Sequence, residues 1–186
     1  MRKIKGFKLV LRPHEVRRRA KKAGLDLDAA GLPEPVLLKT LERLARVLVP
    51  GVIFDTFGVP DPDQPLLSPM PGLAYSLILA TLGEGLSSAR ATEAALPEAL
   101  WPILEETALD ECVRFASGLL ADEAAKDNCE LSPISPVVSC DALSAAARKL
   151  DASKLGVAVV DGRLAPAASL AVSLSWLAKS KAKGRK

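Results

Sequence analysis

The sequence has few of the residues from which catalytic and metal sites are usually built. Its 186 residues include one histidine, His14, and three cysteines, and only 4% of its residues are aromatic. A Ser-His-Asp or Cys-His arrangement would have to use His14, which follows a proline at a highly charged helix start. An exposed histidine near a helix cap is therefore the simpler interpretation. The scarcity of aromatic rings argues against a stacking platform for single-stranded nucleic acid.

The cysteines, Cys112, Cys129 and Cys140, are odd in number and lack the paired spacing of a zinc site. Their spacing argues against a metal site and against a disulfide framework. Cys112 falls on an apolar helix face, so we expect it in the core. Cys129 and Cys140 lie near predicted loops, where a helix start at Cys140 is the one feature that favours a reactive thiol. Free cysteines are typical of a reducing compartment, and we expect a cytoplasmic protein.

The chain also has no long apolar run. The longest, residues 166–178, is interrupted by three serines and is shorter than the roughly 20 residues that a membrane-spanning helix needs. The basic residues near the start precede no apolar stretch of the kind found in signal peptides. With 49% hydrophobic and 25% charged residues, the composition is typical of one globular domain without a membrane partner.

Charges of the two signs are separated along the chain. Residues 1–22 have ten basic side chains and one acidic, residues 177–186 have five basic and none acidic, and the other 154 residues have ten basic and 21 acidic. The net charge of +3 therefore conceals an acidic body with two basic ends. Such a body disfavours strong nucleic-acid binding, so we expect no nucleic-acid partner.

Charged helix faces offer no catalytic pair in this sequence. The basic side chains of an expected helix over residues 13–22 should face water or an acidic partner protein. Glu105 with Glu106, and Asp110 with Glu111, are adjacent in sequence and point in different directions on a helix. We therefore expect these carboxylates to form a solvated face.

Hydrophobic periodicity and turn residues predict alternating helices and strands. Helices are expected over residues 13–22, 34–49, from about 87, from 96 to about 126, and over 141–150. Strands are expected over residues 4–11, 52–59, 72–82, 155–160 and 169–177, with loop or edge segments over 60–72 and 131–138. This order predicts an α+β fold, a single domain in which a mixed or antiparallel sheet packs with helices. We divide the chain into a basic N-terminal segment (1–12), the α+β domain (13–178) and a basic disordered tail (179–186).

Residues 83–88, Gly-Glu-Gly-Leu-Ser-Ser, join an expected strand to an expected helix. Backbone amides at such a junction can hold phosphate. However, Ser88 stands at the third glycine of the dinucleotide motif, and Glu84 would place a like charge beside a phosphate. We expect a tight strand-to-helix turn, while a nucleotide-dependent enzyme stays an alternative that would need a parallel sheet.

Several short motifs follow one another along the chain. They are Glu15-Val16-Arg17-Arg18 with Gly24, Ala80-Thr81-Leu82-Gly83, Leu109-Asp110, Leu131-Ser132-Pro133, Leu155-Gly156-Val157, and the serine-rich segment from Pro166 to Ser173. In this order, over about residues 13–175, they resemble the activation domain of vitamin B12-dependent methionine synthase and its small stand-alone relatives.

That resemblance implies an α+β domain that binds S-adenosylmethionine and docks against a cobalamin-binding domain. There it supports the reductive remethylation of cob(II)alamin formed by accidental oxidation. Cobalamin would come only through a partner chain, either another corrinoid-binding protein or a cobalamin-dependent methionine synthase without its own activation domain. The resemblance places S-adenosylmethionine at one loop, formed by Glu130, Leu131, Ser132, Pro133, Ile134 and Ser135.

This loop departs from the family pattern of Arg, an apolar or aromatic residue, Ser or Ala, Pro, Gly and Tyr. Glu130 reverses the charge of the arginine and cannot pair with the methionine carboxylate. Ile134 adds a side chain where glycine would let the ligand approach the backbone, and Ser135 lacks the tyrosine ring. Ala168 replaces a lysine common near the final serines. Two expectations stay open: a reactivation protein that binds S-adenosylmethionine in an altered way, or a relative that has lost it and docks on a corrinoid protein or another partner without catalysis.

Overall fold

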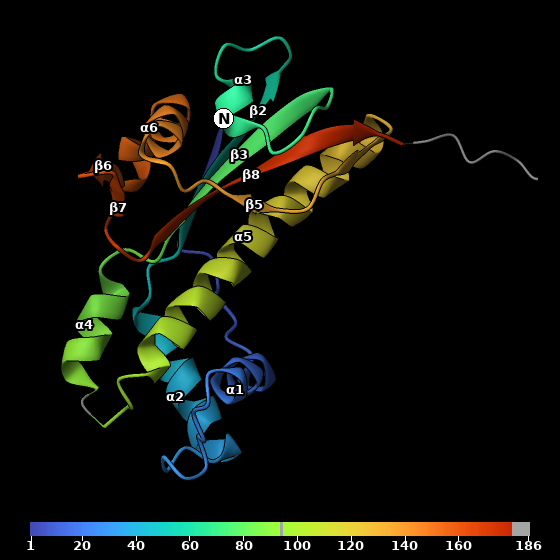
Figure 1. Cartoon of the computed structure of the whole chain (residues 1–186). Helices are drawn as coiled ribbons and strands as arrows, with labels where there is room; N and C mark the ends of the chain where they lie inside the picture. Colours follow the sequence, from blue (N-terminus) through green and yellow to red (C-terminus); the bar gives the residue numbers. More distant parts are fainter. Residues whose placement is uncertain (94, 180–186) are drawn as a thin grey trace, which may run out of the picture.

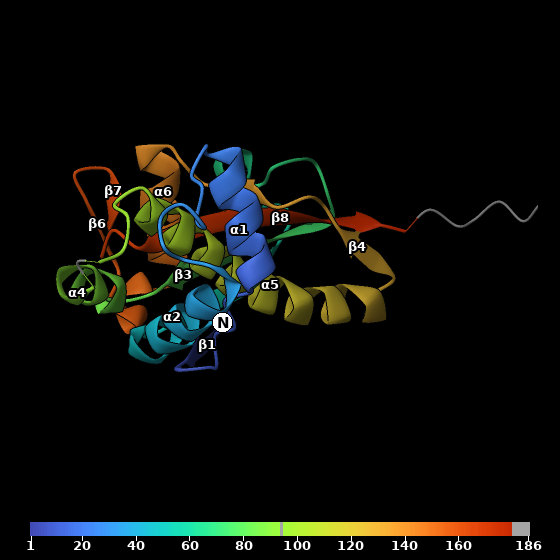
Figure 2. The ribbon, with the colours of Figure 1, turned by 90° about the horizontal axis from the view of Figure 1, so that it is seen from below.

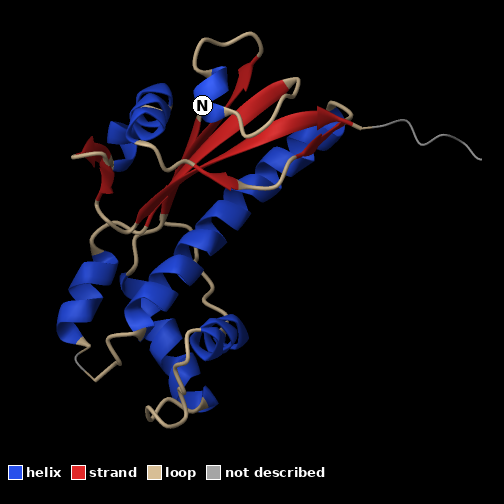
Figure 3. Cartoon of the chain, in the orientation of Figure 1, coloured by secondary structure: helices blue, strands red, loops and turns tan. Residues whose placement is uncertain are grey.

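The computed structural model describes residues 1–93 and 95–179, so the tail expected over residues 179–186 lies outside the described residues except for Lys179. The chain forms a single α+β domain, in which helices pack around a twisted sheet (Figures 1 and 3). Its helices are α1 (Pro13–Lys22), α2 (Glu34–Val47), α3 (Gln64–Leu67), α4 (Gly85–Thr92), α5 (Leu100–Lys126) and α6 (Cys140–Lys149), with a 3₁₀ turn at Ala152–Leu155. Its strands are β1 (Arg2–Lys5), β2 (Gly51–Gly58), β3 (Ala74–Thr81), β4 (Cys129–Leu131), β5 (Ser135–Pro136), β6 (Ala158–Val160), β7 (Arg163–Ala165) and β8 (Ser169–Ala178).

The main sheet has the strand order β1-β2-β3-β8-β4, and β5 also pairs with β8. Within the described part of the chain, every one of these pairs is antiparallel. β3 is buried along almost its whole length because its side chains are apolar on both faces, which suits a central strand. The α+β prediction is therefore confirmed. The alternative of a nucleotide-dependent enzyme required a parallel sheet. It is wrong, because the sheet is antiparallel.

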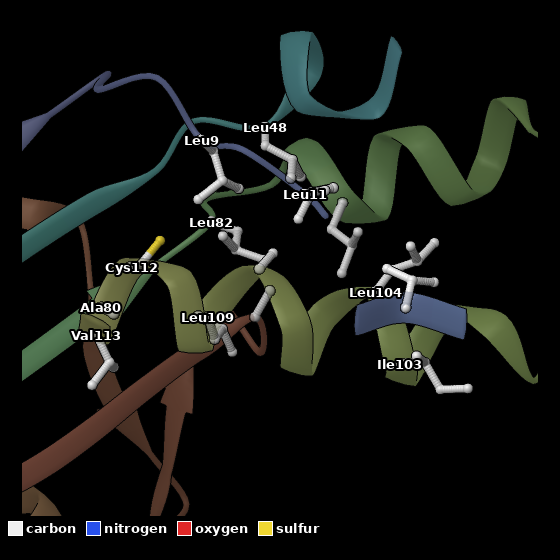
Figure 4. Close-up of a cluster of buried hydrophobic side chains, with 14 of the residues drawn as sticks. Leu9, Leu11, Leu48, Ala80, Leu82, Ile103, Leu104, Leu109, Cys112 and Val113 are labelled. Atoms are coloured by element: carbon white, nitrogen blue, oxygen red, sulfur yellow. The ribbon is translucent and has the colours of Figure 1, made fainter. Parts of the chain in front are cut away.

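The long helix α5 crosses one face of the sheet and forms the larger core with it (Figure 1). Its buried side chains include Leu104, Cys112 and Val113, which lie in the same cluster as leucines of the N-terminal segment and as Leu82, the residue after β3 (Figure 4). α1, α2 and α4 gather around the first half of α5, beyond one end of the sheet (Figures 1 and 2). The prediction that Cys112 belongs to the core is confirmed.

A second core lies on the opposite face of the sheet, where α6 covers Tyr75 and Leu77 of β3. α6 begins at a serine cap: Ser139 Oγ accepts a hydrogen bond of 3.2 Å from the N–H of Ala142. Pro13 and Pro35 stand in the first turns of α1 and α2, where a missing N–H costs nothing.

Three predicted elements differ from the structure. The strand expected over residues 4–11 is limited to β1, because only Arg2–Lys5 pairs with β2. The strand expected over residues 155–160 starts late, since Gly156 adopts a left-handed conformation (φ 75°) after the 3₁₀ turn. The proline-rich segment 60–72 includes the single turn α3.

Candidate functional site

The loop that the resemblance assigns to S-adenosylmethionine lies along the outer edge of the sheet. Leu131 pairs with Trp176 and Ser135 pairs with Ser173, so three loop residues stand opposite two residues of β8. This surplus residue makes the loop a β-bulge between β4 and β5. The structure thus places all six predicted site residues on one edge, where they run alongside β8.

The backbone N–H and the side-chain hydroxyl of Ser132 both form hydrogen bonds with β8. Its N–H donates to the carbonyl of Ser175 at 2.9 Å, and its Oγ accepts from the N–H of Ser175 at 2.9 Å. The same hydroxyl donates to the carbonyl of Pro133 at 3.0 Å. The side chain therefore takes the place of a strand carbonyl across the bulge. It is buried and already hydrogen-bonded.

The exposed residues of this edge present the wrong chemistry for a carboxylate ligand. Glu130 is solvent-exposed and Ile134 is 47% exposed, so the loop offers an acid and an alkyl group where the resemblance led us to expect a cation and a bare backbone. Pro133 has no backbone N–H to donate. None of the six side chains can donate the bidentate hydrogen bonds with which an arginine holds a carboxylate.

A second candidate is a cleft of about 460 Å³ between α4, the first half of α5 and the start of β8, which we name the α4–α5 cleft. It brings together segments that are far apart in sequence. Its lining residues include Ser87, Arg90, Trp101, Glu105, Glu106, Asp110, Ala168 and Ser169. Two of the family-like motifs contribute directly, the Leu-Asp pair of α5 and the serine-rich strand. A third, the Ala-Thr-Leu-Gly segment, lies just behind it.

Thr81 joins these motifs. Its Oγ1 accepts hydrogen bonds from the Ser169 hydroxyl at 2.9 Å and from the N–H of Gly83 at 3.1 Å. The N–H of Leu82 donates to the carbonyl of Ala168 at 2.9 Å. Ala168, which stands where the family commonly has a lysine, is buried in this contact. These motif residues therefore form hydrogen bonds that connect the end of β3 to the start of β8.

The turn after β3 requires glycine at two positions for different reasons. Gly83 has a positive φ of 62°, and a Cβ at Gly85 would lie 2.3 Å from the carbonyl oxygen of Val47. Backbone conformation explains Gly83 and close packing explains Gly85, without a phosphate. The predicted strand-to-helix turn is confirmed.

The carboxylates of α5 give the α4–α5 cleft an acidic wall, but they do not form a purely solvated face. Arg19 of α1 contacts Glu106 at 2.9 Å and Asp110 at 2.5 Å, and it also contacts Glu15 at 2.8 Å within its own helix. The prediction of a solvated face is wrong for Glu111, whose side chain is 13% exposed and lies 3.0 Å from Arg114, whereas Glu106 and Asp110 stay 67% and 41% exposed although they are paired. Glu105 lines the cleft without a place in this network.

The basic N-terminal segment is paired with the acidic body in the same way. Arg2 forms an ion pair with Glu123, Arg12 lies 3.8 Å from Glu111, and Arg17 lies 2.5 Å from Asp28. The expectation that the basic residues of the first helix face only water or a partner needs correction, because several of them neutralise acids of the same chain. Hydrogen bonds from Arg18 and Arg19 lower the pKa of Glu15 to about 2.

The remaining reactive side chains stay apart. His14 and Cys140 are exposed, while Cys112 and Cys129 are buried. Burial raises the pKa of the Cys112 thiol to about 12, which makes it a poor nucleophile. Over residues 1–93 and 95–179, no group of three or more His, Cys, Asp or Glu side chains could hold a metal ion. The same residues include no helix that is long and apolar enough to cross a membrane.

Sequence reasoning missed one cluster of charges on the far side of the sheet. Lys149 of α6 contacts Asp61 at 2.8 Å and Asp63 at 3.3 Å, and its Nζ lies 4.8 Å from the centre of the Phe57 ring. The hydrogen bond from Lys149 lowers the pKa of Asp61. These contacts fasten the proline-rich loop to α6. No pattern of neighbouring residues could predict these ion pairs, because 88 residues separate Asp61 from Lys149.

A scan against protein-family models finds no model that matches this chain, and a search of curated proteins finds no match either. The function is therefore argued from the motifs, from the Glu130–Ser135 edge and from the α4–α5 cleft.

Proposed function

We propose that this chain is a relative of the activation domain of vitamin B12-dependent methionine synthase and serves a corrinoid-dependent methyltransferase as an accessory protein. The order of the motifs supports this proposal, and so does their arrangement in space. Thr81 and Ser169 belong to two different motifs and are hydrogen-bonded neighbours, although 88 residues separate them. The corrinoid belongs to a partner chain, either a corrinoid-binding protein or a methionine synthase that lacks its own activation domain.

We further infer that the chain docks on this partner without supplying S-adenosylmethionine. This inference rests on the hydrogen bonds and charges of the Glu130–Ser135 edge. Ser132 already uses its hydroxyl within the sheet, and Glu130 presents a carboxylate where the ligand's own carboxylate would lie. Two like charges without a bridging cation repel each other, so the edge does not fit the ligand.

The part left for this chain is positional. A docked domain can hold a corrinoid-binding domain in one orientation and keep alternative orientations from forming. The methyl donor and the reducing electron would then come from other proteins. This role needs no nucleophile or general base of the chain's own, which agrees with the isolation of His14 and the burial of Cys112.

A second candidate keeps S-adenosylmethionine but places it in the α4–α5 cleft. The cleft has an acidic wall that includes Glu105, and a positively charged sulfonium and amino group would be attracted to carboxylates. Trp101 and Leu109 add apolar lining. In this version the chain reactivates the corrinoid, as the family resemblance implies, through a different ligand site.

Isothermal calorimetry with S-adenosylmethionine at millimolar concentration separates these versions. We expect no detectable heat from the wild-type chain and an unchanged melting temperature. The combined variant Glu130→Arg with Ile134→Gly should gain measurable binding, because it restores both a carboxylate partner and access to the backbone.

Two variants control the calorimetry. If the wild-type chain binds and Glu105→Gln abolishes that binding, the cleft version is correct and docking without the ligand is wrong. If the wild-type chain binds and Glu130→Gln changes the affinity while Glu105→Gln does not, the ligand lies at the edge after all. The far-ultraviolet circular dichroism of each variant checks that it is folded.

A further inference from the structure

The segment of residues 7–11, which connects β1 to α1, has the pattern of a strand without being part of the sheet. Leu9 and Leu11 are buried and point into the core near Leu48 (Figure 4). Lys8 and Val10, which alternate with them, are exposed. This alternation is the reason the sequence predicts a longer first strand. In the structure the alternate burial continues from Lys8 to Leu11, but pairing with β2 has already stopped at Lys5.

The backbone of this segment is unpaired in the part of the chain that the structure describes. Before it, the N–H of Gly6 donates to the carbonyl of Pro50 at 2.8 Å, and after it, the carbonyl of Arg12 accepts from α1. Between these two points, no backbone group of residues 7–11 forms a hydrogen bond within the described residues. Free N–H and C=O groups on an extended segment are a template for an added strand.

A groove of about 730 Å³ runs beside this segment and separates it from α2. Its apolar lining includes Leu41 of α2 and Leu48, which directly follows that helix. Two large apolar side chains at the groove stay open to solvent: Val10 is 54% exposed and Leu38 is 43% exposed. Covering them would remove apolar surface from water, which favours an occupant.

The rim of the groove is mostly positive. Lys8, Arg12 and Arg46 line it together with one acid, Glu42. Arg12 lies 3.8 Å from Glu111, whereas Lys8 and Arg46 are exposed. The charge of the rim therefore selects an acidic occupant over a basic one.

We propose that this groove, which we name the N-terminal groove, binds an extended acidic segment of a partner protein. The segment pairs with residues 7–11 as an added strand, lays its apolar side chains on Val10 and Leu38, and turns its carboxylates toward Lys8 and Arg46. The inference rests on the proposed function only in that a docking protein needs a partner. It holds whether or not S-adenosylmethionine is bound.

A synthetic peptide tests the proposal directly. The probe is about seven residues long, enough to span the segment, and has Glu and Val in turn at every second position with Thr between them, so that Glu and Val share the face that meets Lys8 and Val10. Its controls have Lys in place of each Glu or Pro at the central Val. Fluorescence anisotropy measures affinity, and NMR hydrogen exchange follows the amides of residues 8–11. We expect the Glu-Val peptide to bind and to slow exchange at these amides, and the Lys-Val and Pro peptides to bind at least roughly tenfold more weakly.

Charge reversal gives the matched comparison. Lys8→Glu with Arg46→Glu should weaken binding of the Glu-Val peptide roughly tenfold and strengthen binding of the Lys-Val peptide. Lys39→Glu with Lys126→Glu changes the net charge equally at positions that do not line the groove, and should leave the ratio between the two peptides nearly unchanged.

Three results would overturn the proposal. The first is no binding of the Glu-Val peptide at about 1 mM, which is the weakest affinity of interest. The second is binding without slower exchange at residues 8–11, which would exclude strand addition. The third is slow exchange in the free chain that increases with its concentration, which would mean that a second copy occupies the groove. Calorimetry with S-adenosylmethionine is unaffected by any of these, so failure of this inference and failure of the proposed function are distinguishable.

Discussion

Arg19 and Asp110 are joined by an ion pair of 2.5 Å across 91 residues of sequence. The same guanidinium also contacts Glu15 and Glu106, so one side chain fastens α1 to the middle of α5. Charges that are separated along the chain are thus brought together by the fold. Basic residues near the N-terminus therefore form ion pairs with acidic residues of the rest of the domain.

The first prediction concerns this contact. Arg19 is only 14% exposed, so Arg19→Ala should remove a cation from three carboxylates, of which Glu15 keeps Arg18, and should lower the free energy of unfolding by about 1–3 kcal/mol. Arg18→Ala is the control, because Arg18 is 64% exposed and, among residues 1–93 and 95–179, pairs only with Glu15; it should lower the free energy of unfolding less than Arg19→Ala does. Urea unfolding measures both. Equal costs for the two variants would show that α1 is not fastened through Arg19.

A second prediction concerns pH. The pKa of Glu15 falls from 4.5 to about 2 on folding because Arg18 and Arg19 donate hydrogen bonds to its carboxylate. A carboxylate with a depressed pKa stabilises the fold fully above its unfolded pKa, and this contribution disappears as the pH falls from about 4.5 toward 2. Glu15→Gln should therefore be less stable than wild type near neutral pH, with the gap closing in acid. Thermal melts between these pH values check this, and parallel curves would contradict it.

Which parts of the fold could be predicted depends on how local the signal is. The sequence predicts β3 and α5 well because the spacing of apolar residues within each segment shows which side chains are buried. The same spacing places Cys112 correctly in the core. The strand expected over residues 4–11 was only partly right, because a strand also needs a partner, and the alternation of Lys8 to Leu11 says nothing about one.

The candidate sites show the same limit. The sequence places Glu130–Ser135 in an extended segment, and the structure has them on an edge beside β8. The sequence could not predict the hydrogen bond between the Ser175 N–H and the Ser132 hydroxyl, because the bulge depends on the register of two strands that are far apart in sequence. The Arg19 and Lys149 ion pairs were missed because ionic partners far apart in sequence have no local pattern.

A third prediction tests the bulge. Ser132→Ala removes the acceptor of the Ser175 N–H in a buried setting, and should lower the free energy of unfolding by about 1–3 kcal/mol. Ser135→Ala, a change of the same size on the same edge, should cost less because no side-chain hydrogen bond depends on its hydroxyl in the described part of the chain. Urea unfolding of both variants gives the comparison. A larger cost for Ser135→Ala would mean that the register of the edge is different.

A fourth prediction uses the cysteines. At neutral pH a maleimide should label Cys140 in the native chain, because its side chain is exposed, and should leave Cys112 and Cys129 unlabelled. The pKa of about 12 for Cys112 adds to the protection that burial provides. Mass spectrometry after labelling, with and without urea, identifies the sites. Native labelling of Cys112 would contradict the packing of α5 against the sheet.

We propose that the chain docks on a corrinoid-binding partner without S-adenosylmethionine. The most direct measurement is a titration of the full chain into a methionine synthase cobalamin-binding domain that carries cob(II)alamin, followed by analytical ultracentrifugation and by the absorbance of the corrinoid. We expect a complex whose affinity is the same with and without millimolar S-adenosylmethionine. Absence of a complex, or a complex that forms only when S-adenosylmethionine is added, would contradict this proposal.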